Sequence, residues 1–268
     1  MNEELAELRR KKVFVLDMDG TFYLGNQLIP GALELIRHLK SQQKEPLFFT
    51  NNSSQSRAFY QQKIQRMGLA AVEVPVYTTG EVLAYYLHRE HPGAKVYLVG
   101  TDSLAATMRE EGIMLASQDA AADVVAVGFD TSLVYQKIEH ACTMLRQGAA
   151  FIATNPDFNC PVENGFLPDC GSICAMLEAA TGKKPLYLGK PYSPALEYLV
   201  AETGYQPAEM VIVGDRLYTD IAFGQKYGIM TVLVLSGETN RNDLQEKRNA
   251  VYQPDFVFPS LGELAAIL

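Results

Sequence analysis

The amino-acid sequence predicts an α/β fold built on a doubly wound parallel sheet. Short runs of β-branched and aromatic residues alternate with longer segments whose apolar residues recur every three or four positions. This alternation is the rhythm of β-α-β units. Runs such as 13–16 and 210–214 contain no polar side chain, which is typical of strands covered by helices on both faces.

The N-terminal segment alternates strand and helix three times. We expect strands at 12–17, 46–50 and 76–79, and helices at 31–42, 56–68 and 80–91. The strands are rich in Val, Phe, Leu and Thr, and the helical segments mix apolar and polar residues at helical spacing. This order predicts the first half of a parallel sheet.

The same rhythm restarts near residue 94 and again after residue 183. We expect strands at 94–100, 123–130, 149–157, 184–190, 210–215 and 231–237, with helices at 101–112, at 133–148, from Ser193 and after residue 215. Gly112 and Gly148 stand where helix ends favour glycine. The sequence therefore predicts a core domain made of 1–80 and 183–268, with 81–182 inserted as an α/β cap domain.

Composition and charge exclude several classes of protein. The 268 residues are 48% hydrophobic and carry a net charge of −8 without a basic block, which disfavours a nucleic-acid partner. The N-terminus lacks an apolar signal sequence, and no apolar run approaches the ~20 residues that span a bilayer. We therefore expect a cytoplasmic protein with no membrane partner, whose four cysteines are reduced thiols.

Acidic residues stand at the ends of two predicted strands, where the ligands of a parallel sheet gather. Asp17 and Asp19 are two positions apart and can project from one side, and Asp215 ends a later strand. Clustered carboxylates repel one another unless a divalent cation binds them, and oxygen ligands without His or Cys favour Mg²⁺. Gly20 permits a sharp turn in which Thr21 can hydrogen-bond. The alternative is a strand-to-turn junction with solvated acids.

Two other segments carry groups suited to a phosphate, and a third carries an acid with a supporting role. Thr50, Asn51 and Asn52 follow a strand and precede a helix, where they can hold phosphate oxygens or simply cap the helix. Lys190, between Gly and Pro, can pair with a carboxylate and a phosphate, although a lone lysine is usually solvent-exposed. Asp220, near a helix start, either stabilises that helix or orients Lys190 and the water shell of the metal.

In this order DMDGT, TNNSS, the Lys190 segment and GDRLYTD resemble the four motifs of the haloacid dehalogenase superfamily of phosphatases. The insertion resembles the larger α/β cap of the nitrophenylphosphatase-like subfamily. The resemblance implies that Asp17 is the nucleophile and Asp19 the general acid and base. It also implies a magnesium site formed by Asp17, the Asp19 backbone carbonyl and Asp215. The phosphate site would be formed by Thr50, Asn51 and Lys190.

The resemblance further implies a substrate class. The subfamily includes nucleotide, pyridoxal phosphate and phosphoglycolate phosphatases, so we expect a small phosphorylated metabolite that is hydrolysed through an aspartyl-phosphate. The loop 155–172 is the candidate substrate-reading segment, with Asp157, Phe158 and Gly171 as candidate contacts. Asp169 and Cys170 replace residues that relatives often carry there, and a surface loop without a ligand is the alternative.

Other functions fit parts of the pattern. A phosphomutase or another phosphoryl transferase of the same superfamily would use the same strand ends. A phospho-acceptor binding module would also gather acids with a Thr and a Lys, but Asp19 favours hydrolysis because an acid–base group hastens loss of the phosphoryl group. A glycosyltransferase could use the DxD pattern without needing the other three strand ends. Caps of this type often mediate homodimers, although the sequence shows no interface pattern.

Overall fold

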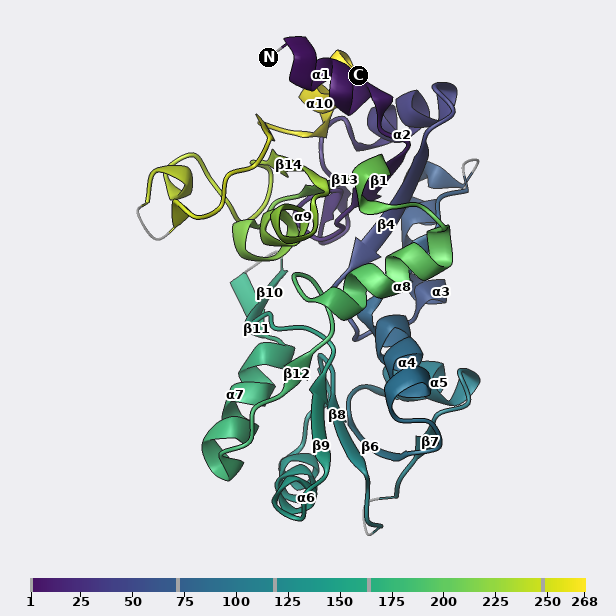
Figure 1. Ribbon diagram of the computed structural model, residues 1–268, viewed down its shortest axis with the longest axis vertical. Coiled ribbons are helices and arrows are strands. Elements are labelled where there is room, and N and C mark those ends of the chain that lie inside the picture. Colours follow the sequence, from purple (N-terminus) through teal and green to yellow (C-terminus); the bar gives the residue numbers. More distant parts are fainter. Residues whose placement is uncertain (1, 71–72, 118–119, 163–164, 247–248) are drawn as a thin grey trace.

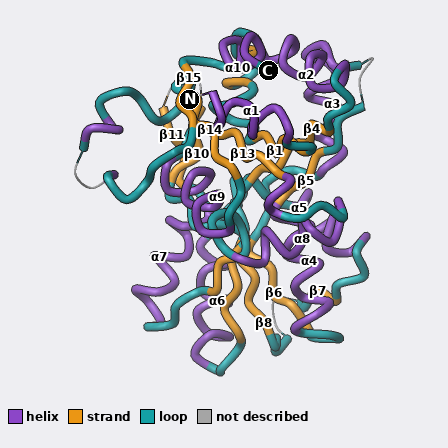
Figure 2. The backbone as a smooth tube through the Cα atoms, turned by 45° about the horizontal axis from the view of Figure 1, so that its top comes forward, coloured by secondary structure: helices purple, strands orange, loops and turns teal. Residues whose placement is uncertain are grey.

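The computed structural model describes residues 2–70, 73–117, 120–162, 165–246 and 249–268. Two parallel sheets lie one above the other along the long axis of the molecule (Figure 1). Helices surround both sheets (Figure 2). This architecture confirms the predicted α/β class with a doubly wound, Rossmann-like parallel sheet.

The larger sheet combines strands from both ends of the chain. Its order is β15 (Phe256–Phe258), β14 (Met230–Val234), β13 (Met210–Gly214), β1 (Val13–Leu16), β4 (Glu45–Thr50) and β5 (Val76–Thr78), and all neighbours are parallel. Val13 and Val15 pack in one apolar cluster. The alternate residues Phe14 and Leu16 pack in another. Both faces of β1 are therefore buried, which explains why this strand has no polar side chain.

Two groups of helices cover the larger sheet. One face packs against α1 (Asn2–Arg10), α2 (Ala32–Ser41), α3 (Arg57–Ile64) and α10 (Leu261–Ile267), and the other against α8 (Ser193–Thr203) and α9 (Ala222–Tyr227). The predicted helix 56–68 is regular only to Ile64 and continues as η1 (Gln65–Leu69), because Gly68 turns the chain with φ +118°. Two short turns, η2 (Pro207–Glu209) and η3 (Leu217–Ile221), precede β13 and α9.

The smaller sheet has the order β12 (Leu186–Tyr187), β9 (Ala150–Ala153), β8 (Val124–Val127), β6 (Lys95–Val99) and β7 (Met114–Leu115). One face packs against α4 (Thr79–Glu90) and α5 (Asp102–Glu110), and the other against α6 (Tyr135–Arg146) and α7 (Cys170–Thr181). Strand β12 pairs with β9, so this sheet extends past the expected boundary at residue 182. The division of the chain into a core and an inserted domain stays a prediction.

Short elements shape the region between the sheets. Strand β2 (Tyr23–Leu24) pairs with β3 (Gln27–Leu28), and β10 (Asn159–Val162) pairs with β11 (Gly165–Pro168). The predicted strand 184–190 is regular only over β12, because the chain then crosses to the larger sheet, where the backbone N–H of Lys190 donates to Asn51. The turn η4 (Asp243–Gln245) lies between β14 and β15.

Two expectations from composition can be compared with the described ranges. None of the helices there is both long and apolar enough to cross a bilayer. Cys142, Cys160, Cys170 and Cys174 are buried and form no disulfide, as predicted.

Candidate active site

The first part of the site is the turn that follows β1. The backbone N–H of Asp17 donates to the carbonyl of Val213 at 2.9 Å, which holds Asp17 in line with the sheet. The chain then turns at Gly20, whose φ is +87°. A side chain at Gly20 would overlap the Asp215 carboxylate, so the close approach of this turn to β13 requires glycine.

Three carboxylates meet at this edge of the larger sheet. Asp17, Asp215 and Asp220 each offer an oxygen atom within 4.8 Å of the others. Asp215 is fully buried, and it accepts hydrogen bonds from Thr21 Oγ1 at 3.1 Å and from the Glu238 backbone N–H at 2.7 Å. Burial and the neighbouring Asp17 raise the pKa of Asp215 to about 7. Crowded carboxylates with raised pKa values are suited to a divalent cation, which offsets their repulsion.

Lys190 lies within this acidic cluster and is only 1% exposed. Its Nζ donates to Asp17 Oδ1 at 2.8 Å, to Asp220 Oδ1 at 2.6 Å and to the Phe49 carbonyl at 3.0 Å. Burial disfavours the charge, but the two carboxylates outweigh it and raise the pKa of Lys190 above its usual range. The structure therefore brings Asp17, Lys190, Asp215 and Asp220 together. Asp17 and Asp215 follow neighbouring strands of the larger sheet, as expected, whereas the strand before Lys190 belongs to the smaller sheet.

The segment after β4 lies beside Lys190. The Asn51 side chain accepts from the Lys190 backbone N–H and donates to the Lys190 carbonyl, both at 3.0 Å. Thr50 Oγ1 accepts from the Asn52 backbone N–H at 3.0 Å. Asn52 Oδ1 accepts from the backbone N–H and the hydroxyl of Ser54, at 3.0 and 2.7 Å. The Asn51 amide thus fixes the position of the Lys190 backbone, and the Asn52 side chain shapes its own loop.

Asp19 lies on the other side of the turn, facing Tyr23, whose hydroxyl donates to Asp19 Oδ2 at 3.5 Å. Burial raises the pKa of Asp19 to about 6; Asp17 contributes to the increase, and Lys63 opposes it. Lys63 was not identified from the sequence. Its Nζ lies 3.7 Å from the centre of the Tyr23 ring. With this pKa, Asp19 can exist in either protonation state near neutral pH.

The described part of the candidate substrate-reading loop lies between the two sheets; residues 163–164 are outside the described residues. Asp157 is 1% exposed, and its carboxylate accepts from Asn51 Nδ2 at 2.8 Å and from Asn155 Nδ2 at 2.9 Å. Phe158 is 58% exposed. A side chain at Gly171 would overlap the Pro156 carbonyl, so glycine lets α7 pack closely on the loop.

Sequence reasoning missed Arg216, which directly follows Asp215. Its Nη1 donates to Asp157 Oδ1 at 2.8 Å, and its Nε lies 3.0 Å from Glu238 Oε2. Its position next to a strand-end aspartate was the available sign, but arginine is usually exposed. Asp169 was also missed as an electrostatic neighbour: burial, then Asp157, raises its pKa to about 7.

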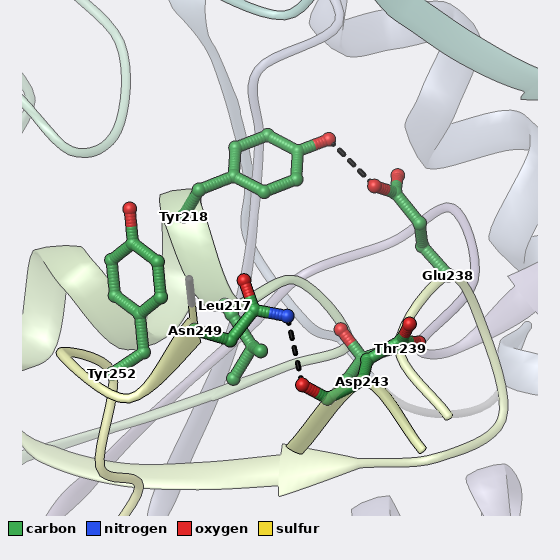
Figure 3. Close-up of a pocket in the computed structure, with 7 residues that line it drawn as sticks. All are labelled: Leu217, Tyr218, Glu238, Thr239, Asp243, Asn249 and Tyr252. Atoms are coloured by element: carbon green, nitrogen blue, oxygen red, sulfur yellow. Dashed lines mark hydrogen bonds between the residues drawn. The ribbon is translucent and has the colours of Figure 1, made fainter. Parts of the chain in front are cut away.

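Glu238 also lines a cavity of about 440 Å³ beside the site, together with Leu217, Tyr218, Thr239, Asp243, Asn249 and Tyr252 (Figure 3). The Tyr218 hydroxyl donates to Glu238 Oε1 at 2.8 Å, as Figure 3 shows. The Glu238 backbone N–H binds Asp215. One wall of the cavity is thus in contact with the acidic cluster.

Comparison with known proteins shows the family. The sequence model of the haloacid dehalogenase-like hydrolase family matches residues 14–114, and that of a HAD-hydrolase-like family matches residues 187–264. The 5'-nucleotidase YutF of Bacillus subtilis is 34% identical, over 91% of this chain and 96% of that protein. An acid sugar phosphatase of Staphylococcus haemolyticus is also 34% identical, over 95% of each protein.

Solved structures agree. The crystal structure of a 4-nitrophenylphosphatase from Thermotoga maritima has 41% sequence identity and a TM-score of 0.90, and the match covers 97% of this chain and 98% of that one. NagD from E. coli K-12 has 32% identity and a TM-score of 0.84, over 94% and 98% of the two chains. The chain therefore belongs to the haloacid dehalogenase-like hydrolases, in their nitrophenylphosphatase-like subfamily, and is a phosphoric monoester hydrolase.

Proposed function

We propose that this protein is a cytoplasmic, Mg²⁺-dependent phosphatase of small phosphorylated metabolites that forms an aspartyl-phosphate on Asp17. The observation that carries the proposal is the contact of Asp17 with Lys190 at 2.8 Å inside a cluster of buried carboxylates. Relatives named 5'-nucleotidase, acid sugar phosphatase and 4-nitrophenylphosphatase support a nucleotide, sugar or similar phosphate monoester as the substrate.

Asp17 and Asp215, with the backbone carbonyl of Asp19, would hold the metal ion. These are hard oxygen donors, and the raised pKa of Asp215 fits a site that a cation completes. When bound, Mg²⁺ would offset negative charge on the phosphoryl oxygens. Asp220 lies 2.6 Å from Lys190 Nζ, so we assign it to orienting the lysine.

The protein residues would then carry out two half-reactions. In the first, an Asp17 oxygen bonds to phosphorus while the bond from phosphorus to the leaving alcohol breaks, and protonated Asp19 donates its proton to that alcohol. In the second, ionised Asp19 takes a proton from water as the water oxygen attacks phosphorus and the Asp17–phosphorus bond breaks. Lys190 offsets charge on the phosphoryl group in both steps, and Thr50 together with the loop that follows it would contact its oxygens.

The smaller sheet would serve as the cap. We propose that the inserted segment, predicted as 81–182 and extended here to include β12, excludes water from the Asp17 edge. Phe158, which is 58% exposed on the loop between the sheets, is the candidate contact for the leaving group. A homodimer formed through this segment stays a prediction.

The test is a screen of phosphorylated metabolites for release of free phosphate with MgCl₂ and with EDTA, using wild type and Asp17→Asn. We expect wild type to release phosphate only with Mg²⁺, Asp17→Asn to be inactive but folded, and the Asp17 peptide to be phosphorylated after acid quenching. Asp102→Asn, an exposed acid in α5, is the matched control. Near-normal turnover by Asp17→Asn would refute the nucleophile.

The same screen separates the alternatives. A phosphomutase or other transferase would pass the phosphoryl group to a second substrate without free phosphate. A phospho-acceptor module would retain it on Asp17. We expect neither outcome, because Asp19, with a pKa of about 6, is suited to activate water beside the phosphorylated residue.

A further inference from the structure

The carboxylate of Asp157 accepts three hydrogen bonds from the protein. It comes from the loop after β9 of the smaller sheet, yet two of its three donors, Asn51 and Arg216, follow β4 and β13 of the larger sheet. The third donor is the neighbouring Asn155. A buried carboxylate with donors on both oxygens has little capacity left for a substrate, and its charge would repel a phosphorylated one.

Arg216 connects this carboxylate to the acidic cluster. Its side chain is 10% exposed, and its guanidinium reaches Asp157 Oδ1 at 2.8 Å, the Asn159 carbonyl at 3.5 Å and Glu238 Oε2 at 3.0 Å. Two of these partners belong to the segment between the sheets. The third, Glu238, binds Asp215 through its backbone N–H at 2.7 Å.

Asn51 makes the corresponding connection to Lys190. The same amide nitrogen that donates to Asp157 Oδ2 at 2.8 Å also donates to the Lys190 carbonyl at 3.0 Å. Asp157 is therefore hydrogen-bonded to Asn51, which fixes Lys190. Through Arg216 it is also linked to Glu238, which binds Asp215. Within the described residues, Asp157 is the carboxylate of the smaller sheet that hydrogen-bonds to both of these strand-end segments.

We propose that the Asp157–Arg216 pair holds the smaller sheet on the catalytic edge of the larger one and thereby sets the positions of Lys190 and Asp215. Both are positioning residues, since neither needs to touch the substrate. A buried ion pair suits this task, because it adds little net stability but penalises any geometry that separates the charges. The catalytic half of this inference rests on the proposed function, whereas the docking half does not.

The thiol of Cys160 provides a direct readout of docking. Cys160 on β10 is 8% exposed, and its Sγ lies 3.7 Å from Asn52 Nδ2 on the larger-sheet side. Separation of the two parts would expose it. Cys142 on α6 is buried in the apolar cluster between the smaller sheet and its helices α6 and α7. We therefore expect it to become exposed only when the smaller sheet and its helices unfold. The rates of alkylation of these two thiols therefore distinguish separation from unfolding.

The experiment measures alkylation of both cysteines by N-ethylmaleimide, with peptide mass spectrometry, in wild type, Asp157→Asn and Arg216→Met. We expect each substitution to speed Cys160 modification at least tenfold and to leave Cys142 unchanged. Arg216→Lys, which keeps the charge but loses the planar fork, should give an intermediate rate. Arg89→Met is the matched control, because Arg89 on α4 also pairs across the two sheets, with Glu197 on α8 at 2.8 Å, but both side chains are exposed. An exposed pair adds little, so the Cys160 rate of this variant should equal that of wild type.

A double variant and steady-state kinetics complete the test. If the two residues act through their ion pair, Cys160 in the double variant Asp157→Asn/Arg216→Met should be alkylated no faster than in the faster single variant. For phosphate release, we expect kcat to fall at least tenfold in both single variants, with a smaller change in KM.

Unchanged alkylation rates of Cys160, or an equal acceleration at Cys142, would overturn the docking role. Faster alkylation with unchanged kcat would overturn the positioning role. Alkylation still reports on docking if wild type releases no phosphate, so that failure of the proposed function is recognised separately.

Discussion

Replacing Lys190 with methionine tests whether one ammonium group holds the acidic cluster together. Methionine has a similar length but no charge. In the native structure Lys190 Nζ lies 2.8 Å from Asp17 Oδ1 and 2.6 Å from Asp220 Oδ1, and the side chain is 1% exposed. Water therefore cannot replace the ammonium group without rearrangement of the surrounding residues.

The expected loss of stability is large. Removing one partner of a buried ion pair costs about 3–5 kcal/mol, because the remaining charge stays buried and unpaired. Here two carboxylates lose the same partner while Asp215 lies close to both. Since a domain is stable by only about 5–15 kcal/mol, a loss of this size shifts unfolding clearly. We expect this loss of stability in metal-free protein at pH 8.

The loss should shrink in acid. Burial raises the pKa of Asp220 to about 6, and Lys190 opposes that increase. Without Lys190 the pKa rises further. A carboxyl group whose pKa is higher in the folded than in the unfolded state binds its proton more tightly in the native protein. It therefore destabilises the fold at a pH where it is ionised. The destabilisation is therefore full above the folded pKa and disappears as the pH falls towards the unfolded value of about 3.9.

Urea unfolding of wild type and Lys190→Met in EDTA, at pH 8 and pH 5, measures both effects. Lys184→Met is the control, because Lys184 is 82% exposed and its Nζ lies 3.8 Å from Glu178; an exposed pair of this kind contributes at most about 1 kcal/mol. A loss at pH 8 no larger than that of the control, or a larger loss at pH 5 than at pH 8, would refute the reasoning.

Two further substitutions test how Asp215 is held. Gly20→Ala should destabilise the protein by about 1–3 kcal/mol more than Gly112→Ala in urea unfolding. Both glycines have positive φ, but only a methyl group at Gly20 meets the Asp215 carboxylate, so equal losses would contradict the close approach. Thr21→Val removes a 3.1 Å hydrogen bond to Asp215 and should raise the Mg²⁺ concentration for half-maximal phosphate release by about 10–100-fold. An unchanged Mg²⁺ requirement would show that Thr21 does not orient the carboxylate.

The fold could be predicted from the sequence because the central strands of the larger sheet, such as β1 and β13, are buried on both faces. The partly exposed edge strand β15 lacks this pattern and was not predicted. A strand such as Val13–Leu16 then has no polar position, and the first polar residue, Asp17, marks its end. Because parallel strands end at the same edge, the proximity of Asp17 and Asp215 follows from the strand pattern alone. Lys190 follows β12 of the smaller sheet, so its position depends on how the chain crosses between the sheets.

The interactions between the two sheets could not be predicted in the same way. Arg216 and Asp157 are 59 residues apart, and nothing in the local sequence of either one indicates the other. Asn51 appeared suited to a phosphate or a helix cap, yet its amide binds the backbone of Lys190, 139 residues away. Such partners depend on how the two sheets pack, which periodicity and strand-end rules do not describe.

The acidic cluster explains why those interactions matter for the chemistry. Lys190 is the cation that contacts Asp17 and Asp220, and a divalent ion would be needed to offset Asp215 as well. If Asp17 is the nucleophile, as proposed, small displacements of Lys190 or Asp215 would weaken the positive charge that can be held beside it. Residues that tie each of these to the smaller sheet, Asn51 and Arg216, meet at the single carboxylate of Asp157. Docking of the smaller sheet and alignment of the charges around Asp17 are therefore expected to be lost together.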